Sequence, residues 1–234
     1  LKDIPFETLP EREVDAVCVI PDIADAKELY HIATSAYVLS KQAKIEIIFR
    51  HYKQELPDTK AYIVPSISGW APIDKRVLDT LKKRASEGAA VYISINSGII
   101  SEFEKLTGLK SKGMIEDNDI HICKFGDDAL PFRYGKKFKT MSIGAKVIAE
   151  DSDGTVVFSK NPYGKGSVFF LNFPLEEMIW KIPNVFNDMT SPYYKIYAEV
   201  AKGLINKKIV LSDNPNIGIT IHRQDDSNYI AVAV

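Results

Sequence analysis

Short apolar runs alternate with amphipathic segments through the first part of the chain. Four runs, at 15–21 (DAVCVIP), 45–49, 61–64 and 89–95, have the length and continuity of strands buried on both faces. Between them, apolar residues recur every three or four positions, which places them on one face of a helix. In the clearest helix, Pro72 and Asp74 suit the first turn, and Gly88 suits the left-handed position past the helix end. Strands that alternate with helices predict a parallel sheet.

The pattern changes after residue 113. From 114 to 160, short apolar runs are separated by turn signals, which predict a small antiparallel insertion. Within it, Asp153-Gly154 is expected to join two strands in a hairpin. The strongest strand signal of the second half is 167–173 (SVFFLNF). The last helix is expected to have Ser191 as its N-cap and Pro192 as its first residue.

These elements predict an α/β fold class, with a flavodoxin-like, three-layer parallel sheet and a small antiparallel insertion. The ranges are 1–14 for a linker from a preceding domain, 15–206 for the α/β domain with its insertion at 114–160, and 207–234 for the start of a C-terminal β domain. In the last range, two strand patterns flank a polar turn, which predicts a β-hairpin that belongs to a following β-sandwich. The chain starts at Leu1 and stops inside a strand pattern, so we expect a longer parent protein.

Charge and composition argue against several classes of partner. Lys and Arg number 30 against 31 for Asp and Glu, for a net charge of -1, and no basic block is present that would attract nucleic acid or anionic lipid. The apolar runs are far shorter than the ~20 residues of a membrane helix, and the first residues lack the pattern of a signal peptide. We therefore expect a soluble protein. Cys18 and Cys123 have neither disulfide nor zinc spacing, which favours a reducing, cytoplasmic compartment.

Candidate site residues follow from the predicted sheet, because ligands of open parallel sheets bind outside the carboxyl ends of the strands. The residues near those ends that are candidates for a crevice or a partner contact are His51, Ser66, Trp70, Asn96, Ser97, Glu176 and Trp180. The two tryptophans suit docking against a partner domain, stacking on a sugar face, or packing over a helix start. The other histidines lie in separate predicted elements, so we expect no metal site.

Two phrases, YIVPSISGWAPIDKRVLDTLKKRASEGAAVYIS and NPYGKGSVFFLNFPLEE, resemble the class I glutamine amidotransferase-like superfamily. They are more similar to its version found as the trimerisation domain of β-galactosidases in glycoside hydrolase family 42 and related glycosidases. The resemblance covers roughly residues 15–206. Active amidotransferases carry a nucleophilic cysteine after the strand that corresponds to 89–95 and a His-Pro-Glu phrase after the strand that corresponds to 167–173. Here the sequence reads Asn96-Ser97-Gly98 and Phe173-Pro174-Leu175-Glu176, so the thiolate and the base are both missing.

The resemblance implies a non-catalytic accessory and oligomerisation domain of a glycoside hydrolase, whose partners are other domains and sibling subunits of the parent, with carbohydrate as a further candidate. The catalytic carboxylates of such parents lie in a preceding (β/α)₈ barrel of ~250 residues. No cofactor is expected, because the glycine-rich stretch 163–166 precedes a strand, whereas phosphate loops follow one. Two alternatives stay open: a divergent hydrolase or amidotransferase relative that uses Ser97 with Glu176 and His51, and a free-standing small-molecule binding module.

Overall fold

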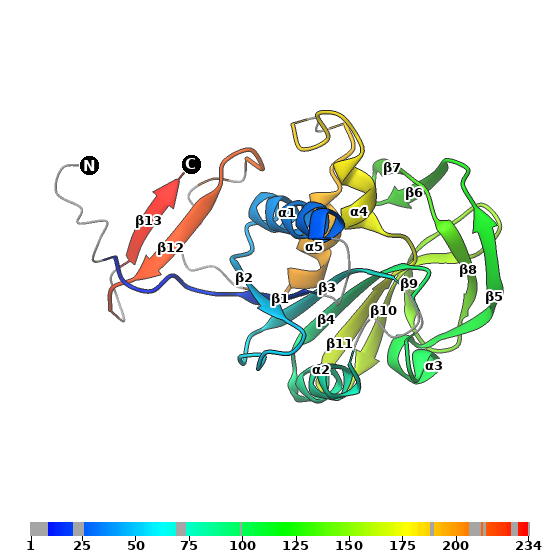
Figure 1. The fold of residues 1–234 in the computed structure, drawn as a ribbon, viewed down its shortest axis with the longest axis horizontal. Coiled ribbons are helices and arrows are strands. Elements are labelled where there is room, and N and C mark those ends of the chain that lie inside the picture. Colours follow the sequence, from blue (N-terminus) through cyan, green and yellow to red (C-terminus); the bar gives the residue numbers. More distant parts are fainter. Residues whose placement is uncertain are drawn as a thin grey trace.

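A seven-stranded sheet forms the centre of the protein, in the order β2-β1-β3-β4-β11-β10-β9 (Figure 1). The structure is a computed structural model that describes residues 9–20, 26–68, 74–98, 100–187, 190–205, 212, 214–225 and 229–233. The five parallel strands are β1 (Ala16–Ile20), β2 (Ile47–His51), β3 (Ala61–Ser68), β4 (Ala90–Asn96) and β11 (Gly166–Leu171). The four early strands and the late β11 therefore confirm the predicted, mostly parallel sheet.

Helices cover both faces of this sheet (Figure 1). On one face lie α1 (Ala26–Gln42), α4 (Leu175–Trp180) and α5 (Tyr194–Ala201), and on the other lie α2 (Lys75–Glu87) and α3 (Phe103–Thr107). Successive strand residues point to opposite faces, so in β3 Ile63 packs in the first core cluster and Tyr62 and Val64 pack in the second.

The end of α2 agrees with the sequence pattern. Its start differs, because Asp74 precedes the helix as its N-cap and does not lie in its first turn, and Pro72 lies outside the described residues. The Asp74 carboxylate accepts a hydrogen bond from the Arg76 N–H at 2.7 Å, and Gly88 follows the helix with a φ of 132°. Its apolar stripe, Val77, Leu78, Leu81 and Ala85, is buried against the sheet. The last helix differs, since α5 begins at Tyr194 and Pro192 lies in the turn before it, so its start was predicted too early.

The segment predicted as an antiparallel insertion divides between the large sheet and two small ones. β5 (Leu109–Asp117) pairs with β8 (Gly135–Ser142), and β6 (His121–Phe125) pairs with β7 (Asp128–Phe132). β9 (Lys146–Glu150) and β10 (Val156–Tyr163) form the predicted hairpin and extend the large sheet, where β10 runs antiparallel to β11. The insertion is thus antiparallel as expected, but its second half is built into the main sheet.

The predicted C-terminal hairpin is present and forms a sheet of its own. β12 (Ile219–Arg223) and β13 (Tyr229–Ala233) pair antiparallel. Residues 9–13 run beside β12: Arg12 and His222 form an antiparallel bridge, and the Glu13 N–H donates to the Ile221 carbonyl at 2.8 Å.

A buried carboxylate connects this hairpin to the α/β unit. Glu46, only 2% exposed, accepts a hydrogen bond from Arg12 at 2.8 Å and another from Lys41. Lys41 also donates to the Thr220 hydroxyl of β12 at 2.9 Å. One carboxylate therefore links α1 to both chain segments at this end of the molecule.

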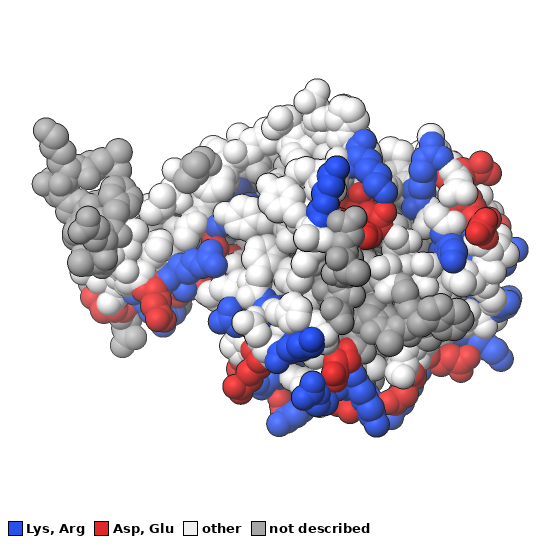
Figure 2. Space-filling view, in the orientation of Figure 1, with Lys and Arg blue, Asp and Glu red and all other residues white. Residues whose placement is uncertain are grey.

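No helix among the described residues is long and apolar enough to cross a membrane. Figure 2 shows Lys and Arg side chains interspersed with Asp and Glu along the rim around α2. This mixture agrees with the balanced charge of the sequence, since neither sign dominates that rim.

Candidate functional site

The carboxyl ends of β3, β4 and β11 meet around one buried carboxylate. Glu176, at the start of α4, is 0% exposed. Its Oε2 accepts hydrogen bonds from the hydroxyls of Ser66 (2.8 Å) and Ser94 (2.5 Å). Its Oε1 accepts from the hydroxyls of Tyr92 (2.9 Å) and Tyr197 (2.8 Å). Four hydroxyls thus satisfy the four lone-pair sites of a carboxylate.

The strand period explains how two of these donors converge. Tyr92 and Ser94 are two positions apart in β4, so their side chains point to the same face of the sheet. Ser66 has a φ of 45°, and its N–H donates to the Ser94 hydroxyl at 2.6 Å. Tyr197 comes from the buried face of α5 and meets Tyr92 edge to face, with ring centroids 5.2 Å apart.

This arrangement keeps the tyrosines protonated. Burial, and after it the negative charge of Glu176, raises the pKa of Tyr92 and of Tyr197 well above the usual value. Both side chains therefore remain phenols that donate to the carboxylate. A general base must reach a substrate proton, and Glu176 is shielded from water with its oxygens already committed. The cluster is suited to cross-linking β3, β4, α4 and α5.

Ser97 retains one feature of a nucleophile elbow. It follows β4 with a φ of 57°, a left-handed conformation that a serine adopts only under constraint. The next residue must be glycine, because a Cβ at Gly98 would lie 2.6 Å from Ile67 Cγ2 and 2.9 Å from the Ile67 carbonyl oxygen. A left-handed residue directly after a strand is the feature that this turn shares with an elbow.

The partners proposed for Ser97 do not join it. Glu176 is occupied by its four hydroxyls, and His51 ends β2, which β1 and β3 separate from β4. The His51 ring packs on Tyr52 at 4.4 Å, and its Nδ1 accepts from the Lys53 N–H at 3.3 Å. Strand order is the physical reason: the edge position of β2 carries His51 away from the centre of the sheet.

The other two described candidates have separate contacts. The Asn96 amide donates to the Glu177 carboxylate, which also accepts from Lys181 at 2.7 Å. Trp180 is half-buried and stacks on His31 of α1, with ring centroids 4.5 Å apart and an interplanar angle of 17°. Tyr30, 62% exposed, meets Trp180 edge-on at 5.9 Å. Trp180 therefore helps to pack α4 on α1, and Trp70 lies outside the described residues.

Sequence reasoning named Ser66 and Glu176 but missed the rest of the hydroxyl shell. Ser94 was visible as a polar residue inside an apolar strand, two positions after Tyr92, and could have been assigned to a polar cluster. From sequence, Tyr197 could be assigned only to the apolar face of a helix. The spacing of apolar residues along the helix identifies that face, but it does not identify the group that the Tyr197 hydroxyl contacts.

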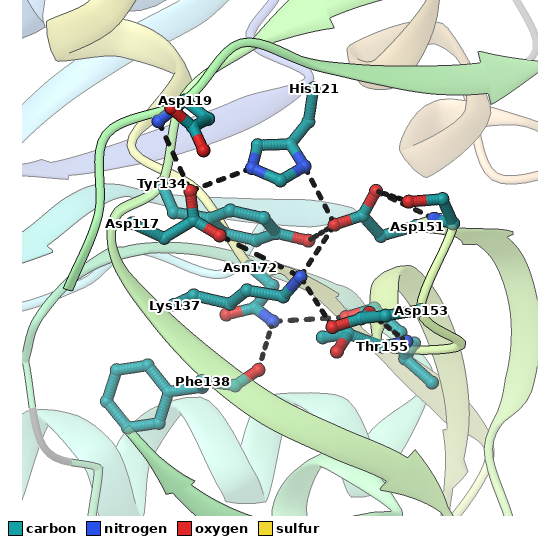
Figure 3. A network of polar contacts seen from close by, with 12 residues as sticks. Asp117, Asp119, His121, Tyr134, Lys137, Phe138, Asp151, Asp153, Thr155 and Asn172 are labelled. Atoms are coloured by element: carbon teal, nitrogen blue, oxygen red, sulfur yellow. Dashed lines mark hydrogen bonds and ion pairs between the residues drawn. The ribbon is translucent and has the colours of Figure 1, made fainter. Parts of the chain in front are cut away.

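A second cluster of ionisable side chains, also missed from sequence, lies between the small sheets and the β9–β10 turn of the large sheet (Figure 3). The His121 ring lies between two carboxylates, with Nε2 2.8 Å from Asp117 Oδ1 and Nδ1 2.9 Å from Asp151 Oδ2. The Lys137 ammonium lies 2.7 Å from Asp151 and 2.9 Å from Asp153. Cations and carboxylates thus alternate between β5, β6, β8 and the β9–β10 turn.

The charges in this second cluster reinforce one another. Burial disfavours charged His121, but hydrogen bonding to Asp117 and the charge of Asp151 outweigh it and raise the histidine pKa. Burial also disfavours charged Lys137, and its bonds to Asp151 and Asp153 outweigh this and raise the lysine pKa. The Lys137 ammonium balances the negative charge of Asp151 and Asp153, as a bound cation otherwise would. No group of three or more His, Cys, Asp or Glu within the described ranges is arranged to hold a metal ion.

Comparison with known proteins relates this fold to parts of glycosidases. No family model and no curated protein sequence matches the chain. α-L-Fucosidase isoenzyme 2 from Paenibacillus thiaminolyticus matches at a TM-score of 0.70 and 13% identity, over 95% of this chain and 38% of that one. A catalytic mutant of Gan42B, a GH42 β-galactosidase from G. stearothermophilus, matches at 0.68 and 11% identity, over 91% and 33%.

A third match has a different extent. A cytoplasmic protein from Salmonella typhimurium LT2 matches at a TM-score of 0.58 and 10% identity, over 82% of this chain and 100% of that one. By contrast, the chain spans about a third of the length of the glycosidases that it matches. At these identities the matches show a glycosidase-related fold, and they do not transfer an activity.

Proposed function

We propose that this chain is a non-catalytic accessory and oligomerisation domain of a β-galactosidase-like glycoside hydrolase. The observation that carries the proposal is the state of Glu176: at the sheet edge where related folds place catalysis, its carboxylate is buried and bonded by four hydroxyls. The glycosidase matches support it, because most of this chain corresponds to about a third of each enzyme. The order β2-β1-β3-β4-β11 is that of flavodoxin-like sheets and supports the amidotransferase-like type of domain.

Exposed apolar side chains support a role in contacts with other domains or subunits. Nine large apolar side chains are exposed in the described ranges, and six of them lie between residues 114 and 143. These six are Met114, Ile115, Ile120, Ile122, Met141 and Ile143. Such a concentration in the small antiparallel sheets is typical of a surface that a partner covers.

Two measurements test the proposal. Sedimentation of the parent protein should give the mass of a defined oligomer, of the kind whose interfaces bury about 800 Å² or more per partner. The reading frame upstream of Leu1 should encode a (β/α)₈ barrel. The isolated chain should not hydrolyse aryl glycosides or glutamine. A monomeric parent would contradict the oligomerisation role, and a frame without a barrel would contradict the glycosidase parent.

One observation favours a second candidate, a divergent hydrolase: the left-handed backbone of Ser97 after β4. The test is hydrolysis of activated aryl esters by the wild-type chain and by Ser97→Ala. Turnover that disappears in this variant but persists in Ser66→Ala would support the hydrolase over the accessory domain. The full-length match of the Salmonella protein keeps a free-standing binding module as a third candidate, which an upstream start codon would support.

A further inference from the structure

An apolar groove of about 330 Å³ lies between α4 and the β6–β7 hairpin, which are neighbours in Figure 1. Its apolar lining consists of Ile120, Pro131, Phe132, Met178 and Ile182. Ile120 is 63% exposed and Ile182 is 37% exposed, so the two isoleucines on opposite sides of the groove present apolar surface to water. Covering this surface would be favourable by about 25 cal/mol for each Å² removed from water.

The remaining lining residues are two cations, Arg133 beside β7 and Lys181 after α4, and no carboxylate lines the groove. Arg133 donates one N–H to the Asn118 carbonyl, which leaves other guanidinium donors for a ligand. Lys181 pairs with Glu177 at 2.7 Å, but its side chain is 69% exposed, and pairs of this kind contribute little and exchange readily. An apolar floor between two cations is complementary to an apolar group flanked by negative charge.

We infer that this groove docks a peptide segment of another domain or another protein, in which a large apolar side chain is flanked by carboxylates. The apolar side chain fills the space between α4 and the hairpin. A carboxylate on one side accepts from the Arg133 guanidinium, which suits the two oxygens of a carboxylate, and a carboxylate on the other side pairs with Lys181.

The surroundings of the groove favour a polypeptide over other occupants. Ile122, 48% exposed, lies in β6 of the same hairpin but does not line the groove, so a small molecule confined to the groove would cover Ile120 and Ile182 and leave Ile122 in water. An extended segment that crosses from the hairpin to α4 covers them together. A membrane surface is disfavoured, because anionic lipid recruitment takes clusters of four or more basic residues and two line this groove. The inference concerns this chain alone and does not depend on the parent being a glycosidase.

The test is a titration of the 234-residue chain with two short peptides, followed by the methyl NMR signals of its isoleucines and methionines. The first probe is acetyl-Asp-Leu-Phe-Asp-amide, and the second is its charge-reversed control, acetyl-Lys-Leu-Phe-Lys-amide. We expect the acidic peptide to shift Ile120, Met178 and Ile182, and to bind at least tenfold more tightly than the basic one. The signals of Ile143, which directly follows β8 and does not line the groove, should not move.

Variants separate charge recognition from general apolar contact. In the double variant Arg133→Gln, Lys181→Gln, the acidic peptide should lose its tenfold advantage. The matched double variant Lys110→Gln, Lys112→Gln, on exposed positions of β5, should retain it. Equal affinity for the two peptides, shifts elsewhere, or no shift at millimolar peptide would overturn the inference. Self-association that the groove variant abolishes, without binding of the acidic peptide, would assign the groove to a second copy and overturn it as well.

Discussion

At the scale of single residues, the dominant feature is a carboxylate held in the core without a neighbouring cation among its hydrogen-bond partners. A buried charge is costly unless its hydrogen-bonding capacity is met. Glu176 meets that requirement with four neutral hydroxyls, contributed by β3, β4 and α5. A carboxylate at an open sheet edge could take part in catalysis, whereas the Glu176 carboxylate stabilises the packing of α4 and α5 on β3 and β4.

Removal of the carboxylate should therefore be costly. We expect Glu176→Ala to lower the free energy of unfolding by about 3 kcal/mol or more, because it leaves four buried hydroxyls without their acceptor. Glu176→Gln should cost less, since its amide oxygen still accepts and the hydroxyls can rotate. Urea unfolding measures both. The control Glu199→Ala removes a surface pair with Lys202 and should cost less than about 1 kcal/mol. Equal losses at the two positions would contradict the role given to Glu176.

His121 provides a pH dependence with a definite sign. Its two ring nitrogens both face carboxylates, and only the imidazolium can donate to both. Because the folded state raises the histidine pKa, the stabilisation is fully present below the unfolded value near 6.5 and is lost as pH rises through the folded value. The pKa values of Asp151 and Asp153 are lowered and that of Lys137 is raised, so these three groups stay charged through this window.

The expected result is that His121→Gln is less stable than wild type by about 1 to 2 kcal/mol at pH 6, the size of a hydrogen bond to a charged group, and that this difference shrinks by pH 9. Urea unfolding at both pH values measures it. His51→Gln is the matched control, since the His51 ring contacts a backbone N–H and the Tyr52 ring and no carboxylate in the described residues. A difference that grows with pH, or that is identical for the two variants, would refute the assignment of a protonated His121.

At the scale of elements, close packing of the β10–β11 turn against the end of α2 fixes how the helix lies on the sheet. A Cβ at Gly166 would lie 2.1 Å from the Ala89 carbonyl oxygen and 2.5 Å from that of Ala85. Gly164 has a φ of 62°, and a Cβ added there would lie 2.5 Å from the Cα of Ser86. Both glycines are thus required by backbone contact with α2 and by turn geometry, and not by any ligand.

Substitution at this contact should cost stability. We expect Gly166→Ala to lower the free energy of unfolding by about 2 to 3 kcal/mol, because the new methyl must displace backbone atoms. Gly144→Ala, where a Cβ would meet nothing within 4 Å, should change it by less than about 0.5 kcal/mol. Thermal unfolding of the two variants side by side measures the difference. A tolerated alanine at 166 would mean that α2 moves freely relative to the turn.

Secondary-structure elements could be predicted from the sequence more completely than side-chain contacts. The end of α2 and the β9–β10 hairpin follow from local signals, namely Gly88 and Asp153-Gly154. The start of α5 was misplaced because Pro192 also suits a turn that precedes a helix. Ser66 and Glu176 could be named from their places near strand ends. Their meeting with Tyr197, and that of His121 with Asp151, depend on tertiary packing, which periodicity does not specify.

At the scale of the whole molecule, Glu46 governs the attachment of the C-terminal hairpin. It pairs with Arg12 and Lys41, and Lys41 reaches Thr220 of β12. We expect Glu46→Ala to speed amide hydrogen exchange in residues 9–13 and β12, because Arg12 loses its partner and Lys41, which donates to Thr220, loses the carboxylate that positions it. Exchange in β4 and β11 should stay unchanged. Glu102→Ala, which removes an exposed pair with Lys82, is the control. Faster exchange throughout the sheet would contradict a local anchor.

The pairing of residues 9–13 with β12 also decides how the domain bears mechanical load. The two segments are antiparallel, and they are joined by the Arg12–His222 bridge and by the hydrogen bond from the Glu13 N–H to the Ile221 carbonyl. Tension applied to their outer ends would open these contacts one after another, like a zipper, before it reached β1. The seven-stranded sheet would carry no load until the contacts between residues 9–13 and β12 had opened. These contacts are therefore the first part of the domain to yield under tension.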